Sequence, residues 1–197
     1  RRTKYFLPHL PTPRVYCHVS GLNQSLIVGE EFISLSIDNY LGADFPLYEK
    51  IGIYKYQRPN MRREKVAPDY ITAWISSEIS NSLADNLLAD MIRHGKILYT
   101  VSVLMPETEE HIIMGYSEEQ WNWVKKNESN MWNALIASKD LYTTSMMIKN
   151  QYVGDGPFTK PFTQESPGKA GAWLGWQIVE SYMQSNPQIS IQQLLQQ

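Results

Sequence analysis

Cysteine is almost absent from this chain of 197 residues. Cys17 stands alone, which excludes an internal disulfide and any zinc site built from several thiolates, and we expect its thiol to be buried. No apolar run reaches the roughly 18 residues that a membrane-spanning helix requires. Neither sign of charge is in excess, with 18 Lys and Arg against 20 Asp and Glu. Nucleic acid and anionic membranes are therefore not expected as partners.

Motifs for metal-dependent or nucleophilic catalysis are also missing. The four histidines, His9, His18, His94 and His111, never lie four residues apart on one predicted helix, so the H-E-x-x-H zinc motif is absent. The sequence contains no phosphate-binding loop and no G-x-S-x-G element. We therefore predict no catalytic residues, no metal ligands and no cofactor.

Glycine, proline and tryptophan are concentrated between residues 153 and 195. Gly and Pro residues from Gly154 to Pro167 predict an ordered loop. Ser166 and Pro167 then resemble an N-cap and a first helical residue, so we expect a helix to begin there and to stop at Asn186. Its apolar positions recur at spacings of three and four: Ala170, Trp173, Leu174, Ile178, Tyr182 and Met183.

Two glycines lie four residues apart on this predicted helix. Gly171 and Gly175 each cost about 1 kcal/mol relative to alanine in a helix interior. The pair therefore predicts the close approach of another backbone, or of a ligand pressed against the same face.

The remaining segments predict a few strands followed by helices. Residues 1–25 are expected to form an extended arm and a short strand at residues 15–19, and the alternation from Leu26 to Asp38 predicts one half-buried strand with Ile33, Leu35 and Ile37 on its buried face. Residues 48–56 are expected to form a loop. Helices are expected at residues 68–80, 82–104, 117–135, 144–152 and 190–195. The order indicates a predominantly helical α+β fold, with residues 26–197 as a single domain.

Several segments together resemble the gliding-motility lipoprotein GldB family known from Bacteroidetes. The matching segments are residues 37–48, 90–99, 113–123, 127–132, 154–159, 165–169 and 171–179. They occur in the family's order and cover most of residues 26–195. Relative to the family, the N-terminal portion is expected to be shortened here.

The resemblance implies a degenerate peptidase scaffold. The family is similar to predicted zinc peptidases of the zincin class, in which one helix carries H-E-x-x-H and a later helix supplies a third ligand. Here the motif would fall within residues 72–77, which contain no imidazole or carboxylate, and the later Glu-Gly pair would correspond to His94 and Gly95. One histidine is too few ligands for catalytic zinc. The resemblance therefore implies a zincin-like domain that has lost its metal.

The resemblance also implies where the protein works and with what. Family members are lipoproteins of the cell envelope, on the periplasmic side or anchored in the outer membrane, so a lipid anchor upstream of this chain and envelope proteins as partners are implied. Cys17 does not follow a lipobox and is not the acylated residue.

We therefore expect a non-catalytic domain that acts through protein–protein contacts. The first candidate site is a groove between the first two predicted helices, bordered by Trp74, Glu78, His94 and Tyr99. The alternative for these positions is packed core.

Two other functions stay open. One is a metal-dependent hydrolase with an unusual ligand set from His94, Glu78 and Asp90. The other is a small-ligand pocket at Trp173 and Trp176 beneath the loop that precedes their helix.

Overall fold

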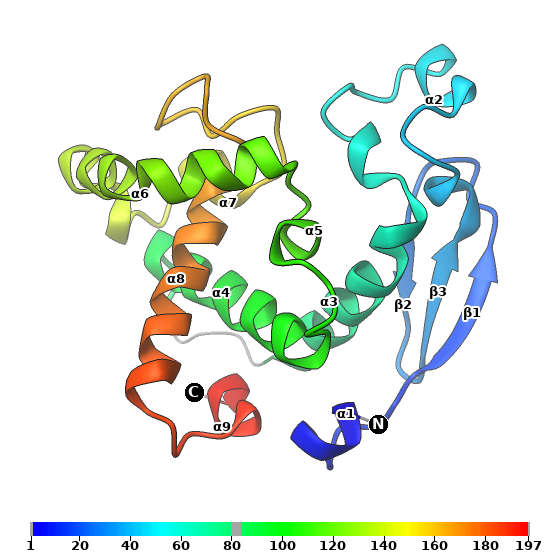
Figure 1. The fold of residues 1–197 in the computed structure, drawn as a ribbon, viewed down its shortest axis with the longest axis horizontal. Coiled ribbons are helices and arrows are strands. Elements are labelled where there is room, and N and C mark those ends of the chain that lie inside the picture. Colours follow the sequence, from blue (N-terminus) through cyan, green and yellow to red (C-terminus); the bar gives the residue numbers. More distant parts are fainter. Residues whose placement is uncertain (1, 80–83, 197) are drawn as a thin grey trace. The chain divides into compact units, whose positions relative to one another are not determined.

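The computed structural model describes residues 2–79 and 84–196 and divides the chain into two compact units (Figure 1). The first unit consists of residues 1–79 and 101–115, and the second of residues 80–100 and 116–197. Helices predominate, and the first unit also contains a small sheet. The predicted fold class, a mainly helical α+β protein, is confirmed.

The first unit is built on a three-stranded sheet with the order β1-β3-β2. β1 (Arg14–His18) is parallel to β3 (Phe32–Ser36), and β2 (Leu26–Val28) is antiparallel to it. The register pairs Ile33 with both Val15 and Val28, so these side chains share one face. Helix α3 (Val66–Glu78) packs against β2 and β3. The sheet therefore has α3 as its main support within this unit.

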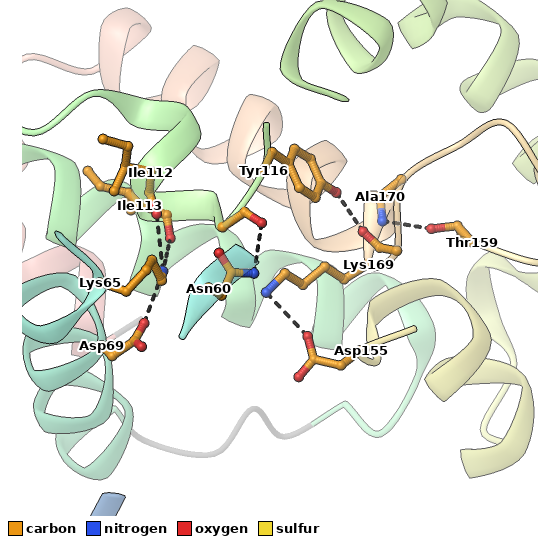
Figure 2. Close-up of polar contacts among 12 residues, drawn as sticks. Asn60, Lys65, Asp69, Ile112, Ile113, Tyr116, Asp155, Thr159, Lys169 and Ala170 are labelled. Carbon is orange, nitrogen blue, oxygen red and sulfur yellow. Dashed lines mark hydrogen bonds and ion pairs between the residues drawn. The ribbon is translucent and has the colours of Figure 1, made fainter. Parts of the chain in front are cut away.

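Short helical segments complete the first unit. They are α1 (Arg2–Phe6), α2 (Pro46–Lys50), α5 (Glu110–Met114) and the 3-10 helices at Ile37–Tyr40, Arg58–Asn60 and Arg63–Lys65. Lys65 fixes α5 to the beginning of α3, because its buried ammonium donates to the carbonyl oxygens of Ile112 and Ile113 at 3.1 and 3.2 Å (Figure 2). Asp69 balances this charge at 2.9 Å. This buried lysine thus supplies an additional donor to carbonyls near the C-terminal end of the short helix.

The second unit is entirely helical among its described residues. It contains most of α4 (Leu87–Leu104), together with α6 (Glu118–Ser138), α7 (Met146–Val153), α8 (Ala170–Ser185), α9 (Ile191–Gln196) and the 3-10 helix Asp140–Tyr142. Helix α8 is central, because its first seven residues are all buried. It packs against α6 and α7.

Glycines allow α8 to approach its neighbours closely, as the sequence predicts. A Cβ atom at Gly175 would overlap the carbonyl group of Met91 in α4, and one at Gly95 would overlap the carbonyl group of Gly175. At Gly171 an added Cβ would lie 2.8 Å from the carbonyl oxygen of Tyr152 in α7. The backbones therefore meet where any side chain would keep them apart.

Most predicted helices are confirmed with shifted ends. The capping box at Ser117 is present, since Gln120 N donates to Ser117 Oγ at 3.2 Å and Ser117 N donates to Gln120 Oε1 at 3.0 Å. The predicted ends at Ser80 and Ser82 lie outside the described residues. Within the described ranges, no helix has both the length and the apolar character needed to cross a bilayer.

The start of α8 differs from the prediction. Ser166 is buried and binds within the preceding loop, where its hydroxyl donates to Thr163 O at 2.6 Å and accepts from Thr159 N at 3.1 Å. The helix begins at Ala170, after Lys169 in the left-handed region with φ of 49°. Ser166 is therefore part of the loop and does not cap the helix.

Four further expectations are wrong. Residues 26–38 form two strands joined by a turn, and Ile37 is exposed because it follows the second of them. Cys17 is exposed, since β1 contributes little to the core. The N-terminal arm contains the short helix α1, and the expected loop at residues 48–56 begins inside α2.

Candidate functional site

A pocket of about 460 Å³ lies entirely within the first unit. Its walls come from the segment that leads into β1, from the turn between β2 and β3, and from the C-terminal end of α3. The lining residues are Pro11, Thr12, Pro13, Arg14, Val28, Gly29, Glu30, Glu31, Ile33, Trp74, Ser77 and Glu78. This volume lies in the range of about 300–1,000 Å³ that is typical of ligand pockets.

One wall of the pocket is apolar and held in place by the core. Trp74 and Ile33 are almost completely buried, with 3% and 1% of their surfaces exposed. Tyr70, one turn before Trp74 on α3, lies with its ring 6.5 Å from the indole and donates its hydroxyl to Pro13 O at 3.3 Å. Burial raises the pKa of Tyr70, so this hydroxyl remains a donor at neutral pH. The segment before β1 is thereby attached to α3 beside the pocket.

The rim of the pocket is negatively charged. Glu30, Glu31 and Glu78 are exposed, and Arg14 is the basic residue of the lining. Among the residues that the structure describes, none of the three carboxylates forms an ion pair with a basic side chain. Glu78 is also the last residue of α3, where the unpaired carbonyls of a helix end add negative potential. The pocket therefore favours a cation.

The indole N–H of Trp74 is an unused donor. Within residues 2–79 and 84–196, its buried Nε1 has no hydrogen-bond partner. A buried donor without an acceptor costs about 1–3 kcal/mol. An acceptor on a bound ligand would remove this cost, and it would reach the buried Nε1 after a small movement of the indole or its neighbours.

The four residues of the predicted groove are divided between the two units. Trp74 and Glu78 lie together in the pocket of the first unit, whereas His94 and Tyr99 lie on the part of α4 that belongs to the second unit. A binding role for His94 and Tyr99 stays a prediction.

His94 lies in a partly buried position among charged groups of both signs. Burial is the main cause that lowers its pKa, and the positive charges of Arg93 and Lys169 lower it further. Asp90 and Asp155 act in the opposite direction. At neutral pH the imidazole is therefore uncharged. Burial and then the charge of Glu180 raise the pKa of Tyr99, which is one turn further along α4.

Trp173 and Trp176 form part of the core of the second unit. Each is 1% exposed, and their rings lie 6.3 and 5.8 Å from the ring of Trp121 on α6. The Nε1 of Trp173 is buried without a hydrogen-bond partner in the described part of the chain. Packing accounts for most of the surface of both residues, and a ligand site at them stays a prediction.

The loop that precedes α8 is held by polar contacts, most of them buried (Figure 2). Thr159 accepts from Ala170 N at 2.9 Å and donates to Pro167 O at 2.7 Å, so one hydroxyl connects the loop with the start of α8. Tyr116 donates to Gly168 O at 2.7 Å, and Lys169 lies 3.3 Å from Asp155. These contacts explain why this polar and glycine-rich segment is ordered.

In the two described ranges, no three His, Cys, Asp or Glu side chains come close enough together to hold a metal ion. Residues 72–77 lie on α3, and His94 lies on the part of α4 assigned to the other unit. The ligand set of Glu78, Asp90 and His94 stays a prediction.

Three lining residues, Arg14, Glu30 and Glu31, were not predicted as site residues from the sequence. Adjacent carboxylates such as Glu30 and Glu31 favour a solvated surface when only the sequence is considered. Their position next to α3 follows from the turn between β2 and β3. Gly29 before the two glutamates was a signal for this turn.

Fold and site together define a helical α+β protein with an acidic pocket on its sheet-bearing unit. The family model for gliding motility protein GldB matches residues 1–197. The chain therefore belongs to the GldB family, a family of gliding-motility lipoproteins. No curated protein and no solved structure matches it significantly.

Proposed function

We propose that this chain is a non-catalytic binding domain that acts through contacts with other proteins of the cell envelope, and that the pocket at Trp74 and Glu78 makes such a contact. The pocket supports the proposal, because it combines a preformed volume with an apolar wall. In the described part of the chain, its carboxylates also form no ion pairs and the indole N–H of Trp74 has no acceptor. Sites that orient a ligand typically have this mixture of apolar walls and a few polar groups.

The proposal includes a degenerate zincin-like origin for the scaffold. It is supported by α3, the helix that the resemblance equates with the motif helix, which has Thr, Ala, Trp, Ile, Ser and Ser at residues 72–77. A helix without imidazoles or carboxylates at these positions cannot supply the two histidines of that motif. The domain is proposed to lie on the periplasmic side of the envelope or at the outer membrane of a member of the Bacteroidetes.

The test is capture of a partner by a pocket-blocked variant. Ser77 lines the pocket in the last turn of α3, so Ser77→Arg would occupy the space with a long cation and also suits a helix C-terminus. Ser181 is equally exposed near the end of α8, and Ser181→Arg is the matched control.

Tagged wild-type chain and both variants would be crosslinked in envelope preparations from the source bacterium. We expect a reproducible partner with wild type and Ser181→Arg, and at least a fivefold lower yield with Ser77→Arg, corresponding to about 1 kcal/mol. Equal yields would remove the pocket from the proposal, and the absence of any specific partner would refute the binding function.

The role of His94 and Tyr99 has its own test. The His94→Ala/Tyr99→Ala double variant is compared with wild type at matched stability. If it still captures the same partner at the same yield, these two residues do not belong to the contact surface.

A further inference from the structure

The pocket in the first unit also indicates what kind of group it accepts. We infer that it binds a basic side chain, of lysine or arginine, within an extended segment of a partner polypeptide. This inference rests on the proposed function, and it adds the chemistry of the partner. Three properties of the pocket support this inference. They are the negative charge of its rim, the distance between its carboxylates, and the indole N–H of Trp74, which has no acceptor within the described residues.

The charge balance selects a cation. Glu30, Glu31 and Glu78 outnumber Arg14, and no described basic side chain is paired with any of them. The C-terminal carbonyls of α3 lie at the same position as Glu78 and add to the negative potential. A ligand with a positive charge is therefore attracted to this rim, and an anion is repelled.

The spread of the carboxylates favours an organic cation over a metal ion. No group of three ligating side chains in the described chain is close enough for metal coordination, and this includes the three glutamates of the pocket. A metal ion needs several oxygen atoms at about 2.0–2.6 Å from one point. An ammonium or guanidinium group, in contrast, can bind one or two carboxylates at hydrogen-bond distance.

The apolar wall and the indole donor favour a side chain that is attached to a peptide. The methylene stem of lysine or arginine packs against apolar surface while its charged end stays at a polar rim. Pro11, Pro13 and Val28 provide such a surface. Within the described residues the N–H of Trp74 has no acceptor, and a peptide carbonyl, which a simple amine lacks, would supply one.

Nuclear magnetic resonance of the tryptophan indoles tests the inference on the full chain. The protein is labelled with ¹⁵N-tryptophan, and the indole cross-peak of Trp74 is assigned with Trp74→Phe or from its contacts with Tyr70. The probe is a blocked peptide, acetyl-Ala-Ala-Lys-Ala-Ala-amide, together with its arginine and norleucine analogues. Cadaverine serves as a free amine without a peptide carbonyl.

We expect the Trp74 peak to move saturably with the lysine and arginine peptides, and at least tenfold higher concentrations to be needed for the norleucine peptide and for cadaverine. Glu78→Gln and the Glu30→Gln/Glu31→Gln variant should each weaken binding about two- to fivefold, the effect of one or two exposed ion pairs. Glu165→Gln, an exposed carboxylate of the second unit, should leave it unchanged. Raising the salt concentration from 0.05 to about 0.5 M should weaken binding, because it screens the rim charges.

Equal binding of the norleucine peptide would overturn the assignment of a cation, and equal binding of cadaverine would overturn the assignment of a polypeptide. An unmoved Trp74 peak would overturn both. Other outcomes distinguish a failure of the proposed function from a failure of this inference. If the glutamine variants capture the envelope partner as well as wild type does, the binding function stands without this chemistry. If the peptide binds while no envelope partner is captured, the pocket chemistry stands and the proposed function fails.

Discussion

Replacing Gly175 by alanine tests the close contact between α4 and α8. The added Cβ would overlap the carbonyl group of Met91 and lie 3.0 Å from its Cα. The obstacle is backbone, so no side-chain rotation can relieve it, and the two helices must separate. Overpacking of this kind costs about 1–3 kcal/mol or more, whereas alanine returns about 1 kcal/mol of helix propensity. Taking the upper end of the cost, we expect a net loss of about 2 kcal/mol.

Thermal unfolding followed by circular dichroism measures this loss. For a chain of this length, about 2 kcal/mol corresponds to a decrease in Tm of about 4–8 °C. Ser181→Ala, at an exposed position of the same helix, should stay within about 0.5 kcal/mol of wild type. The Gly95→Ala/Gly175→Ala double variant should lose less than the sum of the single variants, because the first separation makes room for the second methyl group. A Gly175→Ala protein as stable as wild type would refute the close backbone contact.

Four other outcomes follow from the same structure. Thr159→Val leaves Ala170 N and Pro167 O without their buried partner and should lower the free energy of unfolding in urea by about 1–3 kcal/mol. Thr159→Ser keeps the hydroxyl and should retain most of the wild-type stability. The folded state lowers the pKa of His94 below its ordinary value of 6.5, so the free energy of unfolding should be largest above pH 6.5 and decrease as the pH falls below it. His94→Gln should make this decrease smaller when unfolding is measured at a series of pH values. Protein purified without chelator should contain less than about a tenth of an equivalent of zinc by elemental analysis and show no hydrolase activity when zinc is added; stoichiometric metal would support the hydrolase. Glu78→Gln should raise stability by about 0.3–1 kcal/mol in thermal unfolding, because it removes a negative charge from the end of α3.

Local signals in the sequence predicted the longer helices, since the residues that specify them act within one or two turns, whereas the short helices α1, α2 and α5 were not predicted. Ser117 and Gln120 form their capping box without help from other elements. The spacing of Gly171 and Gly175 indicated a close backbone approach, because glycine is costly in a helix unless a neighbour requires it.

Predictions from the sequence were wrong where tertiary contacts determine the local structure. Ser166 resembles a cap by composition, but its hydroxyl is used by Thr159 and Thr163 across the loop. The alternation in residues 26–38 indicated one exposed and one buried face. β3, however, is the central strand, and four consecutive residues, from Ile33 to Ser36, are buried in it. An alternation of apolar and polar residues predicts a strand with one buried face, so it does not predict a strand that is buried on both faces.

The candidate site shows the same division between local and tertiary information. Trp74 and Glu78 were candidates because the predicted helix that carries them borders the expected groove. Glu30 and Glu31 were not, because nothing within the turn distinguishes a pocket rim from a solvated surface. Only the packing of α3 against β2 and β3 brings the turn beside Glu78.

The cost of the pocket residues to folding stability is an argument that the pocket is a functional site. A carboxylate at the end of α3 and a buried indole N–H that has no acceptor in the described part of the chain both oppose folding. A surface without a function has no need of these costs, and replacing Glu78 by glutamine would remove one of them. If Glu78→Gln stabilises the chain and weakens capture of a basic peptide in the same protein, the two effects have one cause. The carboxylate is then retained for its ligand, because folding alone would favour its loss.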